Sequence, residues 1–146
     1  MHRARKKSGE QAIGRSRGGP STKLHAVVDA LGNPTRMLLT PGQTHEMRVA
    51  EELLSGIHNA YVIGDSVYSA KALVDSLVAR GCTVVIPANP THPQRDYDAH
   101  VYKDRHLMEN FFQRIKRFRR IAMRFEKLAR NFLAFLFLAS SVVWLR

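Results

Sequence analysis

The sequence is poor in cysteine, and this limits the chemistry that it can carry out. Cys82 is the sole cysteine among 146 residues, so neither an intrachain disulfide nor a cluster of metal-binding thiolates is possible. Its neighbours, CTVVIP, are typical of a buried strand, and we expect Cys82 to be a small apolar core residue. The basic N-terminus, MHRARKKSGE, has no apolar segment behind it, so we expect no secretory signal.

Long apolar runs are also scarce. The one candidate for a membrane segment, NFLAFLFLASSVVWL, covers residues 131–145. As a helix it would be about 22 Å long, shorter than a hydrocarbon core of about 30 Å. It also contains Asn131, Ser140 and Ser141. We therefore expect a buried helix and a cytoplasmic, nucleoid-associated protein without membrane contact. A membrane-associated basic protein remains an alternative that cell fractionation would detect.

Negative charge is in short supply. The chain has 12 acidic residues against 23 lysines and arginines, a net charge of +11. The excess is concentrated at residues 1–20 (+5) and 103–130 (+7), whereas residues 21–102 carry −2. This distribution predicts a near-neutral folded centre between two segments that bind a polyanion, and DNA is the partner that we expect.

The order of the expected elements indicates an α/β fold. We expect a flexible basic arm at residues 1–22 and a single domain at residues 23–146. The domain should begin with a hairpin and continue into a βαβ unit with parallel strands, and it should end in long helices. The expected hairpin strands are 23–29 and 35–40, the first helix is 44–56 with Thr44 as its N-cap, the βαβ unit is 60–64, 69–80 and 82–86, and the C-terminal helical region starts near 104.

One acid, Glu109, lies within an aromatic and basic run, YKDRHLMENFFQRIKRFRR (102–120). On a helix it shares an arc of roughly 60° with Tyr102, Arg105 and Lys116, opposite the apolar face. The stripe is compatible with an ordinary solvated helix face. It is also compatible with phosphate binding, provided that a cation neutralises the carboxylate.

A divalent cation would explain why an acid lies among phosphate-binding groups, because carboxylates bind hard cations that in turn bind phosphate oxygens. Such a site needs a second carboxylate. Asp65 directly follows the expected strand 60–64, and ligands of α/β sheets gather beyond the carboxyl ends of parallel strands. We therefore expect the carboxylates of Asp65 and Glu109 to lie roughly 4–9 Å apart, close enough to share a pair of cations.

The spacing Y-x-x-R-x-x-x-E-x-x-x-x-x-x-K, met by Tyr102, Arg105, Glu109 and Lys116, resembles the signature of DDE transposases of bacterial insertion sequences. The runs GRSRGGPSTKLHAVVDALGNPTRMLLTPGQTHE (14–46), VIGDSVYSAKAL (62–73) and RHLMENFFQRIKRFRRIAMRFEKLARNFLAF (105–135) are similar to the insertion-sequence-five family. The resemblance implies a ribonuclease-H-like fold and Mg²⁺-dependent cutting and joining of DNA ends. It assigns Asp65 and Glu109 as catalytic, metal-binding acids, and Tyr102, Arg105 and Lys116 as contacts to the transposon end. We add Arg120 to the DNA-binding face because it continues the basic run.

The sequence departs from the family pattern in two places. After Asp65 it has Ser66-Val67-Tyr68, where relatives more often have a lysine and a glycine. The family's first aspartate, on the first strand of its fold, has no counterpart here. We therefore expect the C-terminal part of a transposase domain whose first strand is missing, inactive alone, and completed by the N-terminal part of the same transposase or by another protomer. A DNA-binding remnant or regulator without catalytic activity is the alternative.

The missing strand would be central in the sheet of the family, which gives a structural expectation. Strand 23–29 should pair with 35–40 and strand 60–64 with 82–86, while few or no ladder hydrogen bonds should join 23–29 to 60–64. The edges of those two strands would then be open to a partner strand.

Overall fold

The computed structural model describes residues 9–145. Its first unit is an antiparallel sheet of three strands in the order β1-β2-β3: β1 (Gly14–Ser16), β2 (Gly19–Val28) and β3 (Pro34–Pro41). The β2–β3 turn is closed by Asp29, whose carboxylate accepts the N–H groups of Leu31 and Asn33. Pairing of His25 with Leu38 lies in the middle of this hairpin, so the predicted pairing of 23–29 with 35–40 is confirmed.

One face of the hairpin carries the larger hydrophobic core. Alternate β2 residues, Leu24, Ala26 and Val28, pack against buried residues of three helices, as period-two side-chain alternation requires. The helices are α4 (His106–Lys116), α5 (Arg119–Ala122) and α6 (Ala129–Trp144). The fully buried members of this core include Phe111 and Leu136.

The second unit is the expected βαβ motif. Strands β4 (Tyr61–Ile63) and β5 (Thr83–Val85) pair in parallel, and α2 (Lys71–Ala79) connects them after the short helix η1 (Ser66–Tyr68). Helix α1 (Glu46–Leu53) links this motif to the hairpin, with an ion pair of 2.6 Å between Lys23 and Glu46. A second core forms here, and it contains the buried Cys82 as predicted.

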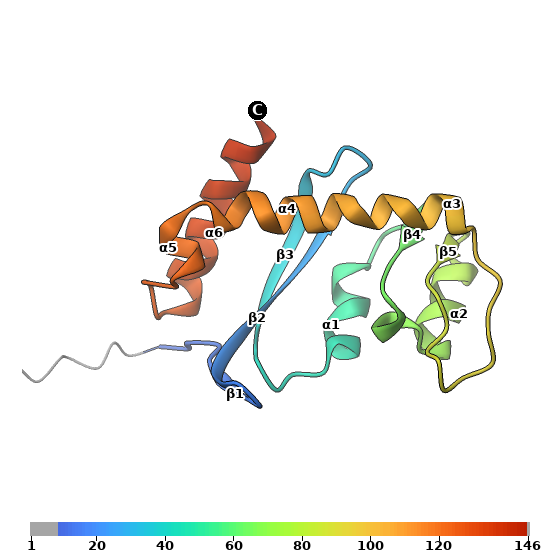
Figure 1. The fold of residues 1–146 in the computed structure, drawn as a ribbon, viewed down its shortest axis with the longest axis horizontal. Coiled ribbons are helices and arrows are strands. Elements are labelled where there is room, and N and C mark those ends of the chain that lie inside the picture. Colours follow the sequence, from blue (N-terminus) through green and yellow to red (C-terminus); the bar gives the residue numbers. More distant parts are fainter. Residues whose placement is uncertain (1–8, 146) are drawn as a thin grey trace, which may run out of the picture.

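A continuous helical rod crosses both units. Helix α3 (Ala99–Tyr102), the single turn η2 (Lys103–Arg105) and α4 follow one another without a break, and the rod runs from the βαβ motif to the hairpin (Figure 1). The α3 end of the rod packs near β5, and the α4 end contributes Ile115 to the hairpin core. The rod therefore sets the position of the predicted polar stripe, within residues 102–116, relative to both sheets.

Within the described residues, no ladder joins β2 to β4, so the two sheets are separate as expected. Three expectations, by contrast, were wrong. Residues 14–16 and 19–22 lie in strands rather than in a flexible arm, whereas residues 1–8 of that arm lie outside the described residues. The N-cap of α1 is His45 rather than Thr44. The C-terminal helical region is interrupted near residues 123–128, where Arg124 adopts φ +43°.

The apolar C-terminal run forms α6, which we expected to be a buried helix; one side of it is buried, whereas Phe137 and Leu138 are 49% and 63% exposed. Phe132, Leu136 and Val143 enter the hairpin core, and the indole N–H of Trp144 donates to the carbonyl of Pro34 at 2.9 Å. Among residues 9–145 no helix is long and apolar enough to cross a membrane.

Candidate functional site

Asp65 lies directly beyond the C-terminal end of β4. The N–H of Gly64 still donates to Val85 at 3.3 Å, after which the chain turns into η1. The Asp65 carboxylate caps this turn by accepting the Ser66 N–H at 2.6 Å. The sequence Ser66-Val67-Tyr68 therefore presents Asp65 through a short 3₁₀ helix and needs no glycine there.

Tyr68 joins this turn to the second hydrophobic core. Its ring lies against the place where a side chain on Gly64 would stand, and burial raises the pKa of its hydroxyl. Tyr68 therefore stays neutral at physiological pH and acts as a packing residue next to Gly64.

The loop at residues 87–98 is held against the same end of the sheet. Arg95 donates to the carbonyls of Ile86 at 3.4 Å and Ser69 at 3.2 Å, which joins the loop to β5 and to the end of η1. Asp98 then caps α3 by accepting the N–H groups of His100 and Val101, and these hydrogen bonds lower the pKa of its carboxyl. The loop is thus fixed to β5 and η1 at one point and caps the first helix of the rod at its end.

Glu109, which lies on the rod, and Asp65 both contact the guanidinium of Arg105. Arg105 Nη2 lies 2.8 Å from Glu109 Oε1, and Arg105 Nη1 lies 3.8 Å from Asp65 Oδ2. These contacts and the rigid guanidinium fork limit the separation of the two oxygen atoms to about 9 Å. Both acids therefore contact the same side chain, and their predicted role as ligands of a shared pair of cations stays a prediction.

Tyr102 completes the contact set around Arg105. The Arg105 guanidinium lies 5.8 Å from the centre of the Tyr102 ring, and that ring packs edge-on against Tyr97 at 5.4 Å. Arg105 thus interacts both with Tyr102 and with Glu109 along the rod, as expected for neighbours in the predicted polar stripe.

The charges of these three side chains do not balance. Two carboxylates face one guanidinium, and all three side chains are partly exposed, at 53% for Asp65, 54% for Glu109 and 40% for Arg105. Oxygen donors of this kind suit Mg²⁺, which is commonly bound by one or two carboxylates together with substrate phosphates and water. In the described part of the chain, no group of three or more acidic, histidine or cysteine side chains could hold a metal ion.

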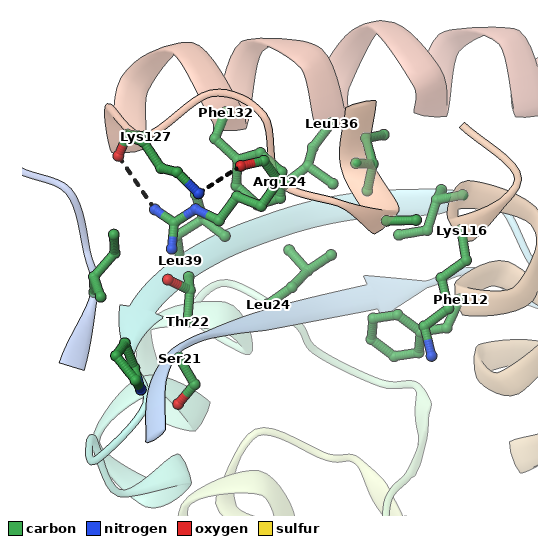
Figure 2. Close-up of a pocket in the computed structure, with 15 residues that line it drawn as sticks. Ser21, Thr22, Leu24, Leu39, Phe112, Lys116, Arg124, Lys127, Phe132 and Leu136 are labelled. Atoms are coloured by element: carbon green, nitrogen blue, oxygen red, sulfur yellow. Dashed lines mark hydrogen bonds between the residues drawn. The ribbon is translucent and has the colours of Figure 1, made fainter. Parts of the chain in front are cut away.

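Lys116 lies at the other end of α4, seven residues and about 10 Å beyond Glu109. There it borders an open pocket of about 640 Å³, whose apolar wall includes Phe112 and Leu24 (Figure 2). Arg124 and Lys127 lie across the pocket from Lys116. The pocket therefore carries positive charge on two sides.

Arg120 is separate from the stripe on the rod. It belongs to α5, and its guanidinium lies 5.3 Å from the Phe135 ring of α6. Arg124 lies 5.0 Å from the ring of Phe132, and burial lowers its pKa from the usual arginine value. The basic C-terminal segment thus presents its charges from several elements rather than from one helix face.

Sequence reasoning missed the residues that assemble the site. Arg95 and Asp98 lie in a proline-rich loop without periodicity, and their partners are backbone groups that no spacing rule identifies. The shared contact of Arg105 with both acids was also missed, although its i,i+4 spacing to Glu109 was a usable signal.

The fold and site define an α/β domain in which Asp65, beyond the end of a strand, and Glu109, on a basic helix, contact the same arginine. The sequence matches the family described as "Transposase DDE domain" over residues 2–144, and the chain belongs to that family. It is 43% identical over 129 residues to a Brucella ovis protein provisionally named the transposase for insertion sequence element IS6501. That match covers 86% of this chain and 99% of the relative. No solved structure matches the chain.

Proposed function

We propose that the chain takes part in Mg²⁺-dependent cleavage and joining of DNA ends, with Asp65 and Glu109 as the cation-binding acids. The observation that supports this role is that both carboxylates contact the guanidinium of Arg105. Family membership supplies the reaction class. When bound, the cation would polarise the scissile phosphate and activate the attacking water or hydroxyl.

The DNA end would lie along the rod. Tyr102 and Arg105 are beside the acids, and Lys116 is two helical turns further along α4, so the helix offers phosphate contacts on either side of Glu109. Arg120 would extend this binding surface from α5. As a protein acting on DNA, the chain would work at the nucleoid in the cytoplasm.

We further propose that the domain is ribonuclease-H-like and takes up a strand, carrying a third acid, between β2 and β4. Within residues 9–145, β2 pairs with β3 along 22–28, β4 pairs with β5, and neither has a strand on its other side at these positions. Such edges expose unpaired N–H and C=O groups and accept an added strand. The N-terminal part of a transposase, or another protomer, would supply it.

The test is cleavage of a DNA duplex that contains an end of the insertion element. The chain is assayed in Mg²⁺ with and without a polypeptide carrying a V-D-[GS]-T-like strand. We expect nicking at the end only when that polypeptide is present, and loss of nicking in Asp65→Asn and in Glu109→Gln. Nicking that persists in either variant would contradict the proposed role of the acids.

The other candidate is a DNA-binding regulator of transposition without catalytic activity. It is favoured by the gathering of only two acids in the described structure. Specific binding of the element end, with no cleavage even in the presence of the added strand, would establish that function instead.

A further inference from the structure

We propose that Arg105 is an internal counter-ion that occupies the cation position between Asp65 and Glu109 until a divalent cation displaces it. This inference rests on the proposed function and concerns the regulation of the same site. It predicts that the chain weakens its own metal affinity when no DNA is bound.

The geometry of the guanidinium carries this inference. Each acid contacts a different nitrogen of Arg105, at 2.8 Å for Glu109 and 3.8 Å for Asp65, so the positive group lies between the two carboxylates. A cation that binds both carboxylates needs the same space, and it repels the guanidinium. Arg105 and a shared divalent cation are therefore competing occupants.

The contacts of Arg105 are also easy to release. Both ion pairs are partly exposed, and pairs of this kind contribute little to stability because water screens them. Arg105 lies in η2, the single 3₁₀ turn within the rod, and such turns often mark positions that change conformation. A DNA phosphate offers the guanidinium a bidentate partner of the same charge type as the acids.

Because Arg105 can exchange the two carboxylates for a DNA phosphate, the binding of DNA and the binding of a divalent cation are coupled. When a phosphate takes the guanidinium, the two carboxylates become available to a cation, so DNA binding favours metal binding. By thermodynamic reciprocity, a bound cation releases Arg105 and favours DNA binding. The chain would then acquire its full cation affinity only where a DNA end is present.

The test measures Mn²⁺ binding to the DNA-free chain, by the loss of the free Mn²⁺ signal in electron paramagnetic resonance. Wild type is compared with Arg105→Gln, and with Lys103→Gln as a control that removes an equal charge two residues away. We expect about tenfold tighter binding in Arg105→Gln, because two exposed ion pairs no longer have to break, and a change of less than about twofold in Lys103→Gln. Adding Glu109→Gln to Arg105→Gln should remove the gain.

Arg105→Lys provides a second variant of nearly native character. A single ammonium cannot present two nitrogens to two acids, so Mn²⁺ should bind more tightly than in wild type and less tightly than in Arg105→Gln. Circular dichroism and melting temperatures are recorded for each variant, so that a loss of folding is recognised.

Two outcomes would overturn the inference alone. Equal or weaker Mn²⁺ binding in Arg105→Gln, with binding still abolished by Glu109→Gln, would leave the metal site intact and Arg105 without this role. Equal tightening in Lys103→Gln would show a general charge effect. Absence of Mn²⁺ binding in every variant would overturn both this inference and the metal-dependent part of the proposed function.

Discussion

Asp65 and Glu109 hold one guanidinium between them, that of Arg105, at 3.8 Å and 2.8 Å. The two acids belong to separate parts of the fold, one following β4 and the other in α4, so this contact depends on tertiary structure. It leaves more negative than positive charge at a surface that we propose faces DNA.

Removal of one acid should not weaken metal-free DNA binding. In Glu109→Gln a carboxylate facing phosphate is lost and Arg105 keeps only Asp65, so affinity in EDTA should stay equal or rise by up to about fivefold. Fluorescence anisotropy with a labelled duplex measures the effect. Asp75→Asn, an acid of equal charge on α2, is the matched control. A clear loss of affinity in Glu109→Gln would show that the stripe does not face phosphate.

The contribution of Lys116 should appear in the salt dependence of binding. Each phosphate neutralised on duplex DNA contributes about −0.9 to the slope of log K against log salt. Lys116→Ala should therefore flatten the slope by about one unit. Lys71→Ala, which removes a lysine on α2 already paired with Asp75 at 2.5 Å, should leave it nearly unchanged. An unaltered slope for Lys116→Ala would exclude this contact.

Stability should decline as the pH falls below the usual titration range of histidine. His25 is buried on β2 and hydrogen-bonded to Thr40 at 2.8 Å, and burial lowers its pKa below the ordinary value of 6.5. The unfolded chain therefore takes up the proton first, so the free energy of unfolding falls as the pH decreases from about 6.5 toward the lower folded-state pKa. Urea unfolding at a series of pH values measures the change.

A neutral residue at position 25 separates the effect of His25 titration on stability from the effects of other titrating groups. In His25→Gln the decline just below pH 6.5 should disappear, although the variant is less stable at every pH. The Lys23 ammonium lowers the pKa of the Glu46 carboxyl below 4.5, so the contribution of that ion pair is lost only in more acidic solution. A pH profile identical to that of wild type would show that His25 titrates normally.

The orientation of α4 can be tested through its buried face. Phe111 is completely buried in the hairpin core, opposite the site face of α4, and Phe111→Ala should cost about 3–5 kcal/mol in the free energy of unfolding. Phe125, which is 54% exposed, is the control, and Phe125→Ala should cost less than about 0.5 kcal/mol. Similar losses in both variants would contradict the packing that turns Glu109 outward.

Local sequence signals predicted most of the elements. The Gly-Asn-Pro turn and its flanking β-prone runs predicted the β2–β3 hairpin, because turn chemistry is set by neighbouring residues. The helical spacing of Leu73 and Leu77 predicted α2, and both side chains are fully buried. Val78, counted in the same pattern, is instead 58% exposed, since only one face of α2 meets the core.

Features that depend on distant partners were not predictable in this way. The break after α5 places Arg124 where its guanidinium donates to the carbonyl of Gln11, a residue more than a hundred positions earlier. The helical pattern of residues 104–145 gave no sign of that contact. The helix phase placed Glu109 on the polar face of α4, but the contact of Arg105 with Asp65 joins residues forty positions apart, and helix periodicity cannot identify it.

The direct test of the central claim replaces each acid by cysteine and changes the metal. Asp65→Cys and Glu109→Cys are assayed for cleavage of the element end, with the added strand-bearing polypeptide, in Mg²⁺ and in Mn²⁺ or Cd²⁺. Thiolates bind Mg²⁺ poorly and softer cations well. If both acids are ligands, each variant should lose cleavage in Mg²⁺ and regain it in the softer metal. Full Mg²⁺-dependent cleavage by either variant would contradict the claim that Asp65 and Glu109 bind the catalytic cation.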